Sequence, residues 1–170
     1  MLITTEYRNQ LKEKYKTGYS PATPIIYLPI INSLINDYKL KSVFDYGCGN
    51  QMLKDYIKGF GIDYHPYDPA LDLLDSVPVD LMLSIHVMEH VEPDCLEDVL
   101  YHMQVMTLKY GLHVIHTTPA KTELPDGRNS HLIQKSPEWW DRTFSRYFKV
   151  VKQWNITKET ILLVKNEFQN

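Results

Sequence analysis

An acidic residue and two glycines stand where they could bind a small charged molecule. In the segment VFDYGCGN, residues 43–50, Asp45 follows an apolar run, and Gly47 and Gly49 come next. Glycines at a turn between a strand and a helix let backbone N–H groups approach a ligand, because no Cβ intervenes. An ionised Asp45 beside that turn favours a cationic ligand, such as one with an ammonium or sulfonium group.

A dinucleotide is the alternative ligand for this turn, and the spacing disfavours it. The fingerprint G-x-G-x-x-G requires a third glycine at position 52, where the chain has Met52. The carboxylate of Asp45 would also repel a pyrophosphate. A cationic ligand therefore fits this segment better.

Histidines offer a second kind of chemistry. His86, Glu89 and His90 match the pattern H-x-x-E-H, which some zinc peptidases carry on a helix. Two histidines four residues apart on a helix can share a metal ion while the glutamate acts as base. The preceding segment DLMLSI is strand-like, however, and Pro93 follows His90 by three residues, so that helix is not expected. A zinc peptidase remains a distant alternative.

A third group of polar side chains lies in residues 117–136, a long segment without clear periodicity. Loops of this length in compact domains are usually functional or disordered. His131 could remove a proton from an acceptor hydroxyl or amine, Asn129 could orient that acceptor, and Arg128 could bind an anionic group. The alternative is a turn whose polar side chains bond their own backbone.

Alternating strands and helices must position these residues. Apolar runs predict strands, which are residues 42–47, 62–68, 80–87 and 112–117. Helical spacing predicts helices that begin near Pro29, Leu53, Pro93 and Pro137, the third of them reaching to Gly111. Residues 150–156 and 160–166 predict a closing antiparallel hairpin. This order predicts an α/β, Rossmann-like doubly wound fold with a mostly parallel sheet.

The sheet places the glycine turn at a binding position and leaves little room for a third strand. Ligands in such sheets bind beyond the carboxyl ends of the strands, where the strand order reverses, and residues 45–49 belong there. Only eleven residues separate Asp68 from Asp80. A helix and a strand do not fit, so we expect the third strand to be missing or vestigial. Pro66 agrees with an edge position for the second strand.

Three of these segments together resemble the class I S-adenosylmethionine-dependent methyltransferases. VFDYGCGN is similar to their first motif, typically an acid followed by G-x-G-x-G, although its third glycine falls on Gln51 here. YDPALD is similar to their second acidic site, and DLMLSIHVMEHVEP to their fourth-strand region. The segment DGRNSHLI is also similar to short bacterial and phage-encoded predicted methyltransferases.

The resemblance implies one methyltransferase domain over residues 1–170 with S-adenosylmethionine as its cofactor. In that family the second acid bonds both ribose hydroxyls; here it is Asp68, which follows Gly47 by 21 residues. A carboxylate can accept from two vicinal hydroxyls at once. The cofactor residues that the resemblance implies are Asp45, Gly47, Gly49, Asp68, Pro69 and His86.

The methyltransferase resemblance also places an acceptor site beside the cofactor, and we assign no residue to a metal. His90 and His116 would border the acceptor, beside the loop at residues 117–136 with Arg128, Asn129 and His131. Residues 1–28 form either a lid over the cofactor, with Tyr19 near it, or a tether for the first helix.

Composition limits the partners. The net charge is −3, and the more basic C-terminal part leaves an anionic or nucleotide-like acceptor open beside an ordinary small molecule. Two cysteines without paired spacing indicate reduced thiols in a cytoplasmic protein, and we expect no membrane segment. Methyl transfer to an oxygen or nitrogen atom is the predicted reaction. A cofactor-binding scaffold or partner subunit that has lost transfer is the alternative, and the oligomeric state stays open.

Overall fold

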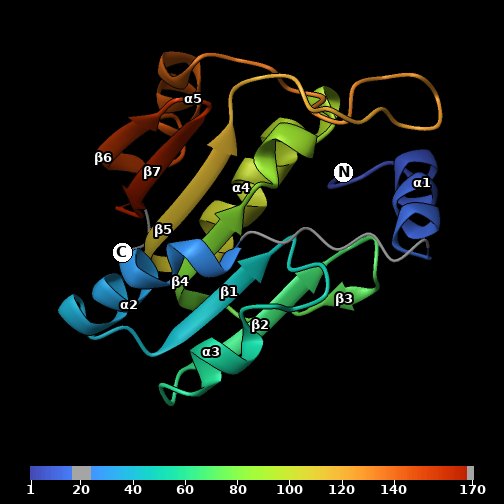
Figure 1. The fold of residues 1–170 in the computed structure, drawn as a ribbon. Coiled ribbons are helices and arrows are strands. Elements are labelled where there is room, and N and C mark those ends of the chain that lie inside the picture. Colours follow the sequence, from blue (N-terminus) through green and yellow to red (C-terminus); the bar gives the residue numbers. More distant parts are fainter. Residues whose placement is uncertain (17–23, 168–170) are drawn as a thin grey trace.

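The computed structural model describes residues 1–16 and 24–167, and within these ranges it contains one sheet of seven strands (Figure 1). The strands are β1 (Ser42–Tyr46), β2 (Asp63–Asp68), β3 (Leu73–Leu74), β4 (Val79–Ile85), β5 (Thr107–His116), β6 (Lys149–Ile156) and β7 (Glu159–Lys165). Their order is β3-β2-β1-β4-β5-β7-β6. The four strands β2, β1, β4 and β5 are parallel, while β7 and β6 form the antiparallel closing hairpin that the sequence predicts.

Helices cover both faces of this sheet. They are α1 (Thr5–Lys16), α2 (Leu28–Asp37), α3 (Lys54–Lys58), α4 (Leu96–Met106) and α5 (Pro137–Phe144), with short 3-10 helices η1 (Pro24–Tyr27), η2 (Met88–His90) and η3 (Pro93–Cys95). The helices α2 and α3 pack on one face, and α4 and α5 on the other. Successive residues of a strand point to opposite faces, so Val43 joins the first layer and Phe44 the second. The doubly wound α/β prediction is confirmed.

The edge beside β2 confirms the expectation of a vestigial third strand. β3 has two residues and runs antiparallel to β2, pairing Leu74 with Tyr67 and Leu73 with Asp68. Pro66 immediately precedes these paired positions, where the missing N–H costs no bond to β3. The short connection between Asp68 and β4 therefore places only the two residues of β3 beside the end of β2.

The third predicted helix is shorter than the sequence predicts. α4 ends at Met106, and residues 107–111, which we expected to be helical, begin β5 instead. The apolar stripe of the helix ends at Met103, whose carbonyl accepts a hydrogen bond of 2.7 Å from the Thr107 hydroxyl. Thr107 then pairs with Val79 of the central strand β4, so sheet pairing takes over where the helical stripe stops.

The parallel strands bring their carboxyl ends to one edge of the sheet. In Figure 1 the arrowheads of β2, β1, β4 and β5 point the same way, and α1 lies beyond them. In residues 1–16 and 24–167, we find no helix that has both the length and the apolar character needed to cross a bilayer. The residues that could bind a ligand or take part in a reaction lie at this edge of the sheet.

Candidate functional site

The glycine turn after β1 is held against the end of β2. Gly47 has φ +72°, and its N–H donates to the Tyr67 carbonyl at 2.7 Å. A Cβ on Gly47 would lie 2.5 Å from Cγ2 of Val87, so a side chain does not fit there without a shift. Gly49 has φ +49°, and its N–H donates to Oδ2 of Asp68 at 3.1 Å. The turn thus requires glycine at position 47 both for its conformation and for its closeness to Val87, which follows β4.

Asp68 is fixed at the end of β2 by donors on both carboxylate oxygens. Its Oδ1 accepts from the Ala70 N–H at 2.9 Å, and its Oδ2 accepts from the Tyr15 hydroxyl at 3.2 Å as well as from Gly49. Burial raises the pKa of Asp68, and these hydrogen bonds oppose that shift. The carboxylate is therefore oriented by the backbone before any ligand arrives.

Asp45 lies deeper, beneath the turn. Its carboxylate accepts a hydrogen bond of 2.5 Å from the Tyr64 hydroxyl, and it is 6% exposed. Burial raises its pKa to about 6, partly opposed by the Tyr64 hydrogen bond. The two acids lie close enough for the charge of Asp68 to raise that pKa further. Direct contact between Asp45 and a cofactor stays a prediction.

A cavity of about 150 Å³ opens beside these residues. Four of the predicted cofactor residues line it from the ends of β2 and β4 and from the glycine turn, namely Gly47, Asp68, Pro69 and His86. His90 lines it as well, and α1 contributes Lys14 and Tyr15. We call Gly47, Gly49, Asp68 and Pro69 the glycine–aspartate rim.

The first helix, α1, is hydrogen-bonded to the glycine–aspartate rim. In addition to the bond from Tyr15 to Asp68, Nε of Arg8 donates to the carbonyl of Pro69 at 2.8 Å. Tyr15 is a site residue that the sequence analysis missed, and no local signal distinguishes it from other tyrosines of α1. The choice between lid and tether for residues 1–28 stays open, and Tyr19 lies outside the described residues.

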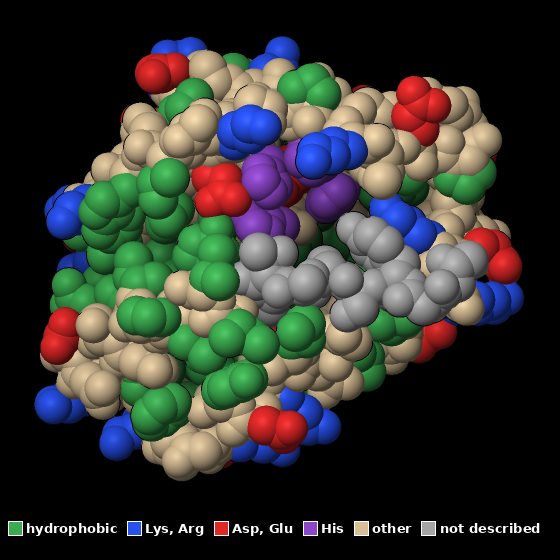
Figure 2. Space-filling model, viewed as in Figure 1, with side chains coloured by type: hydrophobic (Ala, Val, Ile, Leu, Met, Phe, Trp, Pro, Cys, Tyr) green, Lys and Arg blue, Asp and Glu red, His purple; other side chains and the backbone are tan. Residues whose placement is uncertain are grey.

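The histidines form the other half of the site. In Figure 2 histidine side chains gather on one face, beside acidic and basic side chains. We call the six residues of this group the histidine rim: His86, Glu89, His90, His116, His131 and Glu159. They come from the end of β4, from η2, from the end of β5, from the loop at residues 117–136 and from the start of β7.

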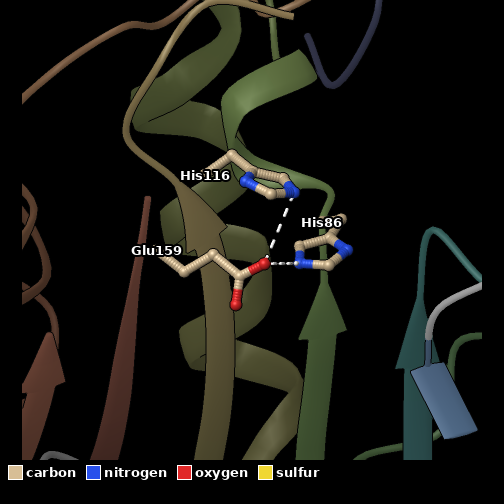
Figure 3. Close-up of side chains that lie close together, drawn as sticks. All are labelled: His86, His116 and Glu159. Atoms are coloured by element: carbon tan, nitrogen blue, oxygen red, sulfur yellow. Dashed lines mark hydrogen bonds and ion pairs between the residues drawn. The ribbon is translucent and has the colours of Figure 1, made fainter. Parts of the chain in front are cut away.

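Within the histidine rim, His86 and His116 both lie beside the carboxylate of Glu159 (Figure 3). Oε1 of Glu159 lies 3.1 Å from Nε2 of His86 and 3.5 Å from Nε2 of His116. The two imidazole rings stack at 4.3 Å between centroids, and the Tyr27 hydroxyl donates to Oε2 of Glu159 at 2.6 Å. Glu159 and Tyr27 were missed by the sequence analysis, because only the pairing of β7 with β5 brings Glu159 opposite His116.

The other three members lie against the loop at residues 117–136. Nδ1 of His90 lies 2.6 Å from the Ser130 carbonyl, and Nδ1 of His131 lies 2.6 Å from the Thr118 carbonyl. A carbonyl oxygen only accepts, so both Nδ1 atoms carry the proton and both Nε2 atoms keep a lone pair. Glu89 is fully buried beside them.

Burial sets the charge of these groups. It lowers the pKa of His90 to about 4 and raises that of Glu89 to about 8. The pKa of His86 falls to about 4, because burial and His116 outweigh the attraction of Glu159. Burial also lowers the pKa of His131. These imidazoles are neutral near pH 7 and can accept a proton or bind a cation.

Asn129 and Arg128 are bound to their own loop. Oδ1 of Asn129 accepts from the N–H groups of Ala120 and His131, both at 3.0 Å, and its Nδ2 donates to the Ala120 carbonyl. Arg128 forms an ion pair with Asp126 at 2.7 Å in the turn. These contacts favour the alternative in which polar side chains bond within the turn. The predicted roles at an acceptor stay predictions.

The helix that a zinc peptidase requires is not formed. His86 has φ +55°, a left-handed conformation that is rare outside glycine, and η2 begins only at Met88 and has three residues. His86 bonds to Glu159, whereas Glu89 and His90 face His131. The strained backbone of His86 turns its side chain toward the tips of β4 and β5, and such strain is common at functional sites.

Solved methyltransferases share this architecture. The 1,6-didemethyltoxoflavin-N1-methyltransferase of Burkholderia thailandensis matches with a TM-score of 0.68 and 13% identity, over 98% of this chain and 91% of its own. The DhpI complex with S-adenosylhomocysteine matches at 0.57 and 12% identity, over 94% and 93%. The methyltransferase domain of the bacterial protein CtHen1-CN matches at 0.58 and 11% identity, over 81% and 96%.

These similarities lie in the fold and not in the sequence. No family model matches the chain, and a search of curated proteins found no match. The strand order with β7 inserted antiparallel between β5 and β6, and the glycine turn after β1, agree with the resemblance seen in the sequence. The chain has the fold of the class I S-adenosylmethionine-dependent methyltransferases.

Proposed function

We propose that this protein is a single-domain methyltransferase that transfers a methyl group from S-adenosylmethionine to an oxygen or nitrogen atom of a small acceptor. The observation that carries the proposal is the position of Asp68. Its carboxylate stands at the end of β2, bonded to the glycine turn, and lines one cavity together with His86 and His90. One cavity therefore joins the two rims.

The residues of the glycine–aspartate rim fit the cofactor. A carboxylate offers about four lone-pair positions, and protein donors use three of those on Asp68. One position is left for a ribose hydroxyl, and a second becomes accessible when the Tyr15 hydroxyl moves. Gly47 lines the cavity in which the amino-acid end would lie, and the negative charge of Asp45 beneath the turn favours a cationic ligand.

Transfer needs orientation more than acid–base chemistry. When bound, the cofactor supplies the methyl group: an acceptor electron pair forms the new bond, the C–S pair stays on sulfur, and the acceptor loses a proton. Holding two reactants in line supplies much of such a rate, and a base is needed only for a protonated acceptor. His131 fits that role, because its Nδ1 donates to Thr118 and its Nε2 keeps a lone pair.

The other residues of the acceptor side hold the loop and the acceptor in place. Asn129 and Arg128 hold the loop that carries His131, while His90 and His116 border the acceptor. One similar protein was solved with 1,6-didemethyltoxoflavin, which supports a small molecule as acceptor. An anionic or nucleotide-like acceptor agrees with the basic residues of the C-terminal part.

Turnover of methyl-labelled cofactor with a library of small hydroxyl and amine compounds tests the proposal. Label in an acceptor supports an enzyme. Binding of S-adenosylhomocysteine without label in any acceptor, also with a cell extract, would favour the scaffold alternative. Absence of cofactor binding would remove both.

A further inference from the structure

One buried carboxyl oxygen in the histidine rim has no hydrogen-bond partner. Glu89 is fully buried, and its Oε1 accepts from the His116 N–H at 3.2 Å. Its Oε2 has no hydrogen-bond partner among residues 1–16 and 24–167. A buried polar atom without a partner is costly, and a native structure seldom leaves one without a reason. A cation beside Oε2 would provide that reason.

Two imidazoles lie near the carboxyl group of Glu89, in the tautomer that binds metals. The Nδ1 atoms of His90 and His131 donate to backbone carbonyls, each at 2.6 Å, so their Nε2 atoms carry the free lone pairs. Histidines that bind a metal commonly donate their other ring nitrogen to a carbonyl or carboxylate, which fixes the ring and the tautomer. The loop carbonyls of Ser130 and Thr118 already do this.

The distances allow one ion between the three side chains. Glu89, His90 and His131 each offer one ligand atom, and these atoms lie within 4.8 Å of one another. Ligands at about 2 Å from a tetrahedral ion lie roughly 3.3 Å apart. A contraction of up to about 1.5 Å between these atoms, by side-chain movement, closes the site.

We propose that Glu89, His90 and His131 bind one divalent transition-metal ion at the tips of β4 and β5. Two imidazoles and one carboxylate suit Zn²⁺, Co²⁺, Fe²⁺ or Mn²⁺ better than Ca²⁺ or Mg²⁺, which prefer ligand sets of oxygen atoms. Three protein ligands leave at least one position open, as in metal sites that act on a substrate.

The neighbouring group of His86, His116 and Glu159 is less suited to hold the ion. Both oxygens of Glu159 already have partners, since Oε1 lies by His86 and His116 and Oε2 accepts from Tyr27. This group supports the site from the side: His116 donates its N–H to Glu89, and its ring stacks on that of His131. The carboxylate of Glu159 therefore offers a matched control for that of Glu89.

The ion would refine the acceptor class, an extension that rests on the proposed function. His90 lines the same cavity as Asp68, so an ion on His90 lies on the acceptor side of the cofactor site. A bound metal ion lowers the pKa of a hydroxyl that it binds and orients its oxygen. The lone pair of His131 then holds the ion, and the ion replaces that histidine in activating the acceptor. The proposal therefore favours an acceptor that is methylated on an oxygen atom.

The test measures metal binding without cofactor or acceptor. Tag-free full-length protein is treated with a chelator, dialysed and titrated with Co²⁺, which reports its ligands by visible absorption, and with Zn²⁺ against a coloured indicator. The expected result is one ion per chain for both metals, with Zn²⁺ displacing Co²⁺. Absence of stoichiometric binding of either ion overturns the proposal.

Four variants locate the ion. Glu89→Gln and His131→Gln should each weaken binding about 100-fold or more, because each removes one of three ligands. Glu159→Gln should change it less than about threefold, and so should His65→Gln, whose histidine bonds Asp75 on the edge of the sheet. Circular dichroism verifies that each variant is folded. Wild-type affinity in both Glu89→Gln and His131→Gln, or a loss only in Glu159→Gln, contradicts the proposal.

One further variant separates this proposal from the proposed function. Asp68→Ala should bind Co²⁺ as the wild type does, even though it should not bind the cofactor. Metal binding without any cofactor binding in the wild type leaves the ion site standing and removes the methyltransferase. Cofactor binding without metal binding does the reverse.

Discussion

The two halves of the site are built in different ways. The glycine–aspartate rim comes from one short stretch, residues 47–69, which follows β1 and contains α3 and β2, and its turn bonds directly to Asp68. The histidine rim draws its six residues from five separate segments, which meet only because β4, β5 and β7 are neighbours. The first half is local and depends on backbone conformation. The second depends on the complete sheet.

The difference explains what the sequence could predict. Gly47 was predicted from the glycine turn after an apolar strand, and Asp68 from the resemblance of YDPALD to the second acidic site of the methyltransferases. Their spacing agreed with one helix and one strand, and the structure brings both to one cavity. The partnership of His131 with Glu89 spans about forty residues of chain, and no spacing rule encodes it. Glu159 looked like an ordinary hairpin residue until the register of β5 with β7 placed it opposite His116.

The fold itself was more predictable than the site. The alternation of apolar strands and amphipathic helices gave the parallel core, and the short span after Asp68 gave the vestigial β3. The end of α4 was missed, because Thr107 and its neighbours join the sheet through contacts with β4 that lie far away in sequence. Tertiary pairing there overrides a helical pattern.

The largest effect is expected at Gly47, in the glycine–aspartate rim. Gly47→Ala places a Cβ 2.5 Å from Cγ2 of Val87 and strains a backbone at φ +72°. We expect the unfolding free energy to fall by roughly 3 kcal/mol, from strain and overpacking together. Chemical denaturation measures it.

Gly61→Ala is the matched control for that substitution. Gly61 has φ +68°, and nothing lies within 4 Å of its Cβ position. Only the conformational cost, about 1 kcal/mol, should remain. Equal losses in both variants would show that the contact between the glycine turn and Val87 carries no energy.

His113, a buried histidine outside the histidine rim, should make the unfolding free energy depend on pH. His113 is fully buried in β5 and bonded to Ser84 at 2.8 Å, and burial lowers its pKa to about 3. Below pH 6.5 the unfolded chain binds a proton at this residue and the folded chain does not. The unfolding free energy therefore falls as the pH falls from 6.5 toward 3, by up to about 1.4 kcal/mol per pH unit.

Denaturation at pH 6 and pH 5 in wild type and His113→Gln isolates this contribution. His86 and His90, with lowered pKa values, add to the slope in both proteins, so the difference between the slopes belongs to His113. The variant should lose about 1 kcal/mol per pH unit of the wild-type slope. Identical slopes would contradict the buried neutral state of His113.

The smallest effect is expected from α1. Tyr15→Phe removes the hydroxyl that occupies Oδ2 of Asp68. A ribose hydroxyl then has one competitor fewer for Oδ2, and the affinity for S-adenosylhomocysteine should rise about threefold, the value of a modest hydrogen bond. Calorimetry measures it, with Tyr56→Phe on α3 as control. A weaker affinity would place the Tyr15 hydroxyl within the ligand-bound arrangement.

Calorimetric titration of S-adenosylhomocysteine into the wild type, Asp68→Ala and the exposed-strand control Asp63→Ala tests the central claim most directly. The account predicts saturable one-site binding in the wild type, unchanged binding in Asp63→Ala, and a loss of about 100-fold in Asp68→Ala, the sum of two hydrogen bonds to a charged group. Wild-type affinity in Asp68→Ala, or no binding by the wild type, would contradict it.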